Sequence, residues 1–95
     1  MPRPTPLSAA TIDQFLALLP GWTYGEGRLH RTFEFPSFVE AFAFMTKVAF
    51  AAERLDHHPN WTNVWAKVDV TLWTHDVGGV TELDLELAKA MNRAA

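Results

Sequence analysis

The sequence predicts an α+β domain: a four-stranded antiparallel sheet with helices packed on it, in the order helix-strand-strand-helix-strand-strand-helix. Three stretches repeat apolar residues at helical spacing, and between them lie two stretches that alternate apolar and polar residues, as hairpins do. A chain of 95 residues, 48% of them hydrophobic, can build one core and not two. We therefore expect a single domain over residues 8–95, preceded by a flexible, proline-rich lead-in over residues 1–7.

The composition excludes several classes of function. A net charge of -3 leaves no basic face that could neutralise several phosphates, so we expect no nucleic-acid partner. Cysteine is absent, which rules out thiolate metal sites and cysteine nucleophiles. There is no apolar run near the ~18 residues of a membrane span and no signal-peptide pattern. We therefore expect a cytoplasmic protein with no membrane partner.

The first part of the chain is predicted to form a short helix and a hairpin. Ser8 is a good N-cap, and the helical pattern that follows ends at Pro20 and Gly21. From residue 22 to residue 35 the side chains alternate, and Gly-Glu-Gly at 25–27 predicts the turn.

The second predicted helix has the longest periodic pattern. Ser37 can cap its first amides, and Glu40, three residues later, completes the pattern of a capping box. Pro59 disfavours helical backbone at His58, so the helix should end by that point. Its expected buried stripe comprises Phe38, Ala41, Phe42, Met45, Val48, Ala49, Ala52 and Leu55.

Two more strands and a last helix complete the predicted fold. The strands are expected at 60–65 and 67–74, and in the second strand three residues should face the core: Val68, Val70 and Leu72. Thr81 with Asp84 predicts the cap of the last helix. Two apolar residues lie off the buried stripe of that helix and suggest a second surface, which another copy of the chain could cover: Leu85 and Ala88.

The main cluster of chemically active residues is Asp-His-His-Pro at 56–59. If Ala66 and Lys67 form the second hairpin turn, His58 lies opposite His75, and three imidazoles meet at one end of the sheet. Because the unperturbed pKa of histidine is about 6.5, such a cluster suits general acid and base catalysis. Carboxylates expected nearby are those of Glu53, Asp56 and Asp76.

Other interpretations of these residues stay open. A histidine pair at the end of a helix can be purely structural, since a protonated imidazole is favourable against the helix dipole. Adjacent side chains on an extended segment point in opposite directions, so His57 and His58 should not bind one metal ion together, and we expect no metal site. His30 is expected at the surface. The tryptophans of the second hairpin could stack on a flat heterocycle or fill the core: Trp61, Trp65 and Trp73.

The segment AERLDHHPNW, followed by VDVTLWTHDVGGVTELDLELA, resembles the pterin-4a-carbinolamine dehydratases, also known as the dimerisation cofactor of a homeodomain transcription factor. The likeness runs from the first helix to the last. It implies a hydro-lyase of this α+β fold that converts 4a-hydroxytetrahydropterin to quinonoid dihydropterin and so recycles the pterin cofactor of aromatic amino acid hydroxylases. It implies no cofactor for the enzyme itself, a pterin substrate, and a homodimer or homotetramer.

The resemblance also implies roles for particular residues. The family's catalytic histidines correspond to His57, His58 and His75, and its pterin-binding residues to Pro59, Thr74, Asp76 and Val77. Glu53 and Asp56 would support the imidazoles, Glu53 or Asp76 by fixing a tautomer. Two residues depart from the family pattern: Trp65, where many members have Tyr, and Trp73, which could narrow the pterin cleft.

Two alternatives to a recycling enzyme remain. One is a protein-binding dimerisation module, which would not need the histidine set. The other is a pterin-handling accessory in molybdenum cofactor metabolism, in which case no aromatic amino acid hydroxylase would be the partner.

Overall fold

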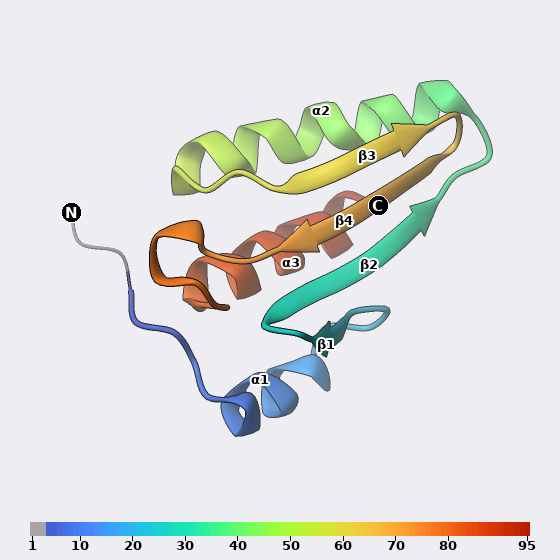
Figure 1. Ribbon diagram of the computed structural model, residues 1–95. Coiled ribbons are helices and arrows are strands. Elements are labelled where there is room, and N and C mark those ends of the chain that lie inside the picture. Colours follow the sequence, from blue (N-terminus) through green and yellow to red (C-terminus); the bar gives the residue numbers. More distant parts are fainter. Residues whose placement is uncertain (1–3) are drawn as a thin grey trace.

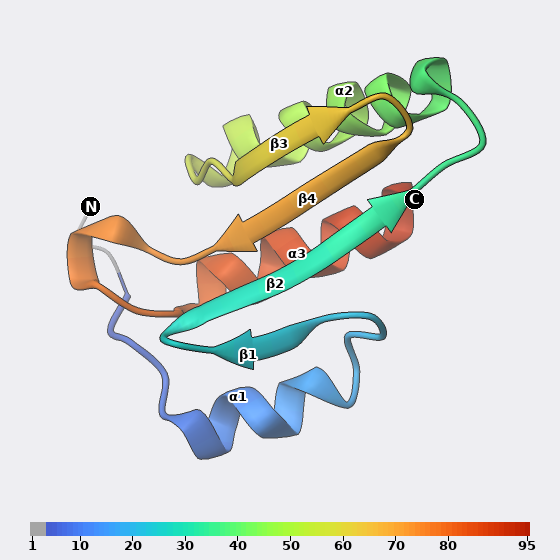
Figure 2. The same ribbon diagram turned by 45° about the vertical axis from the view of Figure 1, so that its right-hand side comes forward.

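The computed structural model describes residues 4–95 and has the predicted order of elements around one sheet. Its helices are α1 (Ala9–Leu16), α2 (Phe38–Leu55) and α3 (Glu82–Ala94), with a short 3-10 helix, η1 (His75–Val77). The antiparallel sheet has the strand order β1-β2-β4-β3, formed by β1 (Thr23–Gly25), β2 (Arg28–Glu34), β3 (Asn60–Val64) and β4 (Lys67–Leu72). Helices α2 and α3 lie along one face of the sheet, and α1 lies beside β1 (Figures 1 and 2).

The core lies between the sheet and the two long helices. The alternation predicted for β4 is confirmed: Val68, Val70 and Leu72 are at most 1% exposed. They belong to one apolar cluster with Phe44 of α2 and Met91 of α3. Within residues 4–95 no helix lies over the opposite face of the sheet.

The chain before α1 is tied to the core at one point. Of the predicted lead-in, residues 1–3 lie outside the described part of the chain. Leu7 packs against the core, and its amide donates a hydrogen bond of 2.8 Å to the carbonyl oxygen of Val80. The last residue assigned to the lead-in is therefore held in place.

The first hairpin turn is confirmed. Gly25 pairs with Arg28, so Glu26 and Gly27 form the two-residue turn, and their φ angles are 53° and 76°. A type I′ turn needs positive φ at both positions, which Gly27 adopts at no steric cost.

The register predicted for the second hairpin is wrong by two residues. Val64, not Trp65, is the last paired residue of β3, and its partner is Lys67. Trp65 and Ala66 therefore form the turn, with Trp65 at φ 52°. The turn is stabilised by the Asn63 side chain, which donates to the carbonyl oxygens of Trp65 and Lys67, each at 3.0 Å. No local sequence pattern indicates that a tryptophan would adopt a left-handed backbone.

The apolar surface that the structure leaves exposed is on α2, not on α3. Leu85 and Ala88 are 3% and 0% exposed and belong to the core of the same chain. The prediction that they form a second surface for another copy of the chain is therefore wrong. The buried stripe of α2 is rotated from the predicted one, because Phe44 and Ala51 take places that were assigned to Phe42 and Ala49.

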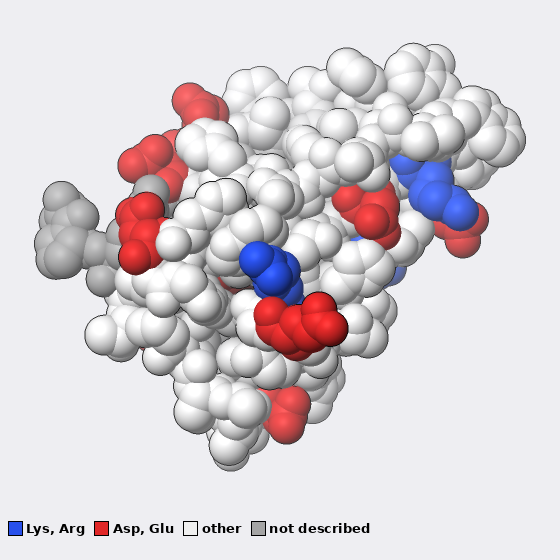
Figure 3. Space-filling model, in the orientation of Figure 1, with Lys and Arg blue, Asp and Glu red and all other residues white. Residues whose placement is uncertain are grey.

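Several large apolar side chains consequently face outward along α2 and on the β3–β4 hairpin. The first turns of α2 and the β3–β4 turn lie next to each other in both views of the ribbon. On the face drawn in Figure 3, no charged side chain shows over the first turns of α2. The exposed residues of this apolar patch are Phe38, Val39, Phe42 and Phe50 of α2, with Val64 and Trp65 of the hairpin.

A polar network joins the loop after α1 to β2 and α3. The Arg31 guanidinium donates to the Pro20 carbonyl oxygen at 2.7 Å and to Asn92 Oδ1 at 2.6 Å, and the Trp22 indole donates to the same Asn92 oxygen at 2.8 Å. Gly21 lies against this network with φ 89°, and a Cβ added there would lie 2.6 Å from Arg31 Cζ. Only glycine fits without displacing the guanidinium.

We expect Gly21→Ala to lower the free energy of unfolding by about 1–3 kcal/mol, the usual cost of a non-glycine residue in a strained backbone conformation. Urea denaturation followed by tryptophan fluorescence measures the loss. Gly25→Ala is the matched control, because a Cβ at Gly25 meets nothing within 4 Å and its φ is not positive. Equal stability of the two variants would contradict this account of Gly21.

Candidate active site

The end of α2 directs the two adjacent histidines to different sides. Asp56 takes a left-handed conformation, with φ 49° and ψ 45°, and its amide bonds the Glu53 carbonyl oxygen at 3.2 Å. The His57 amide bonds the Ala52 carbonyl oxygen at 3.0 Å, which completes a Schellman motif. Aspartate tolerates this conformation better than most residues. The helix therefore ends before His58, as predicted from Pro59.

His57 is buried and is held by a carboxylate from the other end of the chain. Only 6% of the residue is exposed, and its Nε2 lies 2.5 Å from Asp84 Oδ1. The second oxygen of the fully buried Asp84 accepts from the Thr74 hydroxyl and from the Thr81 amide, both at 2.9 Å. A carboxylate on Nε2 makes that nitrogen the proton donor, so Nδ1 is the nitrogen that can exchange a proton with a ligand.

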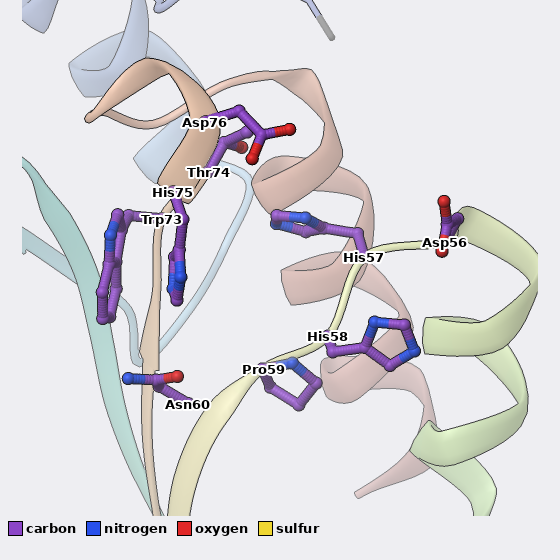
Figure 4. Close-up of a pocket in the computed structure, with 9 residues that line it drawn as sticks. All are labelled: Asp56, His57, His58, Pro59, Asn60, Trp73, Thr74, His75 and Asp76. Atoms are coloured by element: carbon purple, nitrogen blue, oxygen red, sulfur yellow. The ribbon is translucent and has the colours of Figure 1, made fainter. Parts of the chain in front are cut away.

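His58 has a different environment. Its Nε2 lies 2.6 Å from Glu53 Oε2, and both side chains are largely exposed. Its ring is directed toward α2, whereas the His57 ring is directed toward His75 (Figure 4). Glu53 thus contacts the His58 imidazole, whose ring is turned toward α2 and not toward His75.

His75 lies on a short turn beyond the end of β4. Thr74 pairs with Gly79 in an isolated bridge, and the Thr74 amide donates to the Gly79 carbonyl oxygen at 2.8 Å. This bridge closes the loop that contains η1. Because the register differs from the predicted one, His75 does not pair directly with His58, but the loop still brings it to the same end of the sheet.

The three histidines line one cleft of about 270 Å³. Figure 4 shows open space between the His57 and His75 rings. Val77, predicted to contact the pterin, is not among the residues that line the cleft. Those residues are Asp56, His57, His58, Pro59, Asn60, Trp73, Thr74, His75 and Asp76.

A second, wider groove of about 560 Å³ adjoins the cleft on the open face of the sheet, and Pro59, Asn60 and Trp73 line both. Asp69, on the floor of this groove, is occupied by protein partners: it accepts from the Thr32 hydroxyl at 2.6 Å and lies 2.8 Å from His30 Nε2. The hydrogen bond from Thr32 lowers the pKa of the Asp69 carboxyl more than partial burial raises it, and His30 lowers it further. Asp69 is therefore a satisfied anion.

Comparison with known proteins identifies the family. The family model described as pterin 4 alpha carbinolamine dehydratase matches residues 5–94. The chain belongs to this family. Relatives from Rhizobium meliloti (strain 1021) and Chelativorans sp. (strain BNC1) are each 55% identical, and both have the provisional name pterin-4-alpha-carbinolamine dehydratase. The alignments cover 98% of this chain and 91% of the first relative, and 94% and 93% for the second.

A solved structure supports the same assignment. The crystal structure of a transcriptional coactivator/pterin dehydratase from Brucella melitensis superposes with a TM-score of 0.93 at 43% sequence identity. The match covers 96% of this chain and 99% of that one. The fold predicted from the sequence is thus the fold of the pterin 4 alpha carbinolamine dehydratases.

The sequence predicted Asp84 only as part of a helix cap, and its contact with His57 was not predicted. The capping box with Thr81 is present, as predicted. Its bond to His57 joins residues 27 positions apart, and no local pattern reveals it. Thr74, predicted to contact the pterin, is 2% exposed and gives its hydroxyl to the same carboxylate. Among residues 4–95, no group of three His, Asp or Glu side chains could hold a metal ion.

We expect Asp84→Ala to lower the free energy of unfolding of this pterin 4 alpha carbinolamine dehydratase family member by about 3 kcal/mol or more. It leaves two buried donors unpaired, the His57 ring nitrogen and the Thr81 amide, and each costs about 1–3 kcal/mol; the Thr74 hydroxyl keeps the Thr81 hydroxyl, 2.7 Å away, as a partner. Urea denaturation measures the change. Glu82→Ala, two residues earlier in α3 and exposed, is the control. A loss no larger than that of the control would show that the carboxylate does not join these elements.

Proposed function

We propose that this protein is a 4a-hydroxytetrahydropterin dehydratase that uses histidines as general acid and base. The observation that supports this most is the cleft between the His57 and His75 imidazoles. The reaction needs no oxidant or reductant. The 4a-hydroxyl leaves with one added proton as water, a ring nitrogen loses one proton, and a carbon–nitrogen double bond forms in the quinonoid dihydropterin.

The two imidazoles facing the cleft suit opposite steps. Asp84 holds Nε2 of His57, and a carboxylate in that position stabilises the imidazolium that forms when the other nitrogen takes up a proton. We therefore assign His57 as the base that removes the ring proton. His75 is exposed and can exchange protons with water, so it serves as the acid that protonates the leaving hydroxyl.

The remaining predicted residues have supporting roles in this proposal. His58, paired with Glu53 and directed toward α2, shapes the cleft and orients the hydroxyl group. Pro59 and Asp76 line the cleft beside the substrate. The substrate is the product of a pterin-dependent hydroxylase, so the dehydration returns the pterin of aromatic amino acid hydroxylation to its cycle.

We expect His57→Ala and His75→Ala each to lower kcat by about two to four orders of magnitude, the usual contribution of a general acid or base. His58→Ala should lower it by about tenfold, because that ring is directed toward α2 and away from the two imidazoles that face each other. The carbinolamine is generated by a pterin-dependent hydroxylase, and its disappearance is followed by absorbance.

His30→Ala is the matched control for these variants, since His30 is paired with Asp69 outside the cleft and the variant should keep wild-type kcat. No acceleration by the wild-type protein at stoichiometric amounts would exclude the proposed function. Wild-type rates in the His57 and His75 variants would exclude the proposed roles.

We further propose that the chain forms a homodimer or homotetramer through the apolar patch. Val39, Phe42 and Phe50 are 74%, 53% and 73% exposed, and they follow helical spacing along one stripe of α2. Trp65, 71% exposed, extends the patch onto the hairpin. An apolar area of this kind on a small domain marks an interaction surface. In most soluble homo-oligomers with two-fold symmetry the same patch of both subunits forms the interface, so one apolar patch is enough for a second copy of the chain to be the partner.

We expect the double variant Phe42→Asp with Phe50→Asp to be a monomer, because two desolvated carboxylates would oppose association. Light scattering after size exclusion gives the mass. Leu18→Asp is the control: Leu18 is 69% exposed, follows α1 and lies outside the patch, so this variant should keep the wild-type mass. A monomeric wild type would exclude self-association and leave the patch to a different protein partner.

A further inference from the structure

We propose that Trp73 is a positioning residue for His75: the indole holds the imidazole by its face, so both ring nitrogens stay available to the substrate. The inference rests on the proposed dehydratase function. It assigns a role in that reaction to a residue in which this chain departs from the family pattern.

The three imidazoles of the cleft are held in different ways. Asp84 occupies one nitrogen of His57, and Glu53 occupies one nitrogen of His58. Within the part of the chain that the structure describes, neither ring nitrogen of His75 has a hydrogen-bond partner. His75 is also exposed, and a surface side chain changes rotamer freely on the ps–ns timescale unless something restrains it. An acid that must meet a leaving group at hydrogen-bond distance needs such a restraint.

Trp73 supplies the restraint. The indole and imidazole rings are stacked, with centroids 4.2 Å apart and planes inclined by 21°. Figure 4 shows the rings in the order Trp73, His75, His57, so the indole covers the face of the imidazole that is turned away from His57. A bond from a carboxylate would fix the ring at the expense of one nitrogen, whereas a stacked ring fixes its plane and leaves both nitrogens free.

Arg28 restrains the indole in turn. Its Cζ lies 4.1 Å from the centroid of the Trp73 ring, a cation–π contact. Leu29 pairs with Leu72, so Arg28, the first residue of β2, stands across from Trp73, the residue after β4. The groove of about 560 Å³ beyond the indole is open and would let it turn away from His75. The guanidinium on the indole opposes that movement.

Trp73 is among the residues that line the cleft, and in this proposal it acts on the reaction through His75. The indole lies behind His75 and not between the two imidazoles that face each other. The size of the indole therefore affects the position of the His75 ring. It does not set the width of the space between the His57 and His75 imidazoles. A change at Trp73 should act on kcat more than on KM.

The test compares four variants with the wild type in the dehydration assay. We expect Trp73→Leu to lower kcat about tenfold with KM changed by less than about twofold, because it removes an aromatic contact. Trp73→Phe keeps an aromatic face and should stay within about twofold of wild-type kcat. Arg28→Gln should lower kcat about threefold. Arg93→Gln is the matched control, since Arg93 is an exposed residue of α3 outside the cleft, and should have no effect.

An NMR measurement separates positioning from a general loss of structure. The His75 ring protons, assigned by comparison with H75Q, should be shifted upfield by the indole ring current in the wild type and in the Arg93→Gln variant. In Trp73→Leu this shift should be lost while the other histidine signals remain. Wild-type kcat in Trp73→Leu, or a lower kcat with unmoved His75 signals, would overturn the proposal.

The proposal and the proposed function can fail separately. If the wild-type protein does not accelerate dehydration, the function fails, and the positioning role fails with it even where the ring-current shift shows that the stack exists. If the wild type is active and Trp73→Phe loses as much kcat as Trp73→Leu, the function stands and the stacking role is excluded.

Discussion

The buried carboxylate of Asp84 joins three segments that are distant in the sequence. One oxygen contacts the His57 imidazole just after α2, and the other accepts from Thr74 after β4 and from Thr81 at the start of α3. A fully buried carboxylate is costly unless every oxygen has a donor. The need of the buried carboxylate for hydrogen-bond donors therefore also fixes the position of the His57 imidazole. Through Asp84, the end of α2 is connected to the start of the loop that contains His75.

The cleft combines rigid and accessible groups. His57 is buried and has one committed nitrogen, whereas His75 is exposed and held through its ring face. The acid–base pair proposed above would benefit from such a difference, because one group would keep its orientation through the reaction and the other would exchange protons with water. The loop closed by Thr74 and Gly79 gives the exposed member a fixed backbone despite its position outside the sheet.

The apolar patch extends from α2 onto the β3–β4 hairpin. The patch and the cleft contain different residues, so substitutions can change one and leave the other intact. The Brucella melitensis relative is described both as a transcriptional coactivator and as a pterin dehydratase. Within residues 4–95, no helix has the length and apolar character that a membrane span requires.

The sequence by itself determined the features that depend on neighbours within a few residues. Ser8, Ser37 and Thr81 cap their helices, the glycines around Glu26 form the first turn, and Pro59 follows the end of α2, each as the local pattern indicates. The alternation in β4 also gave the buried face, since successive side chains of a strand point to opposite sides.

The tertiary structure decided what depends on long-range packing. Helix α2 is apolar on two sides, so only the sheet determines that Phe44 is buried and Phe42 is exposed. The hairpin register depends on the left-handed backbone conformation of Trp65, which the type of residue does not predict. One oxygen of Asp84 accepts from the amide of Thr81, three residues away, and the other contacts the imidazole of the distant His57. A pattern of neighbours can show the first bond, but the second requires that α2, β4 and α3 have already come together.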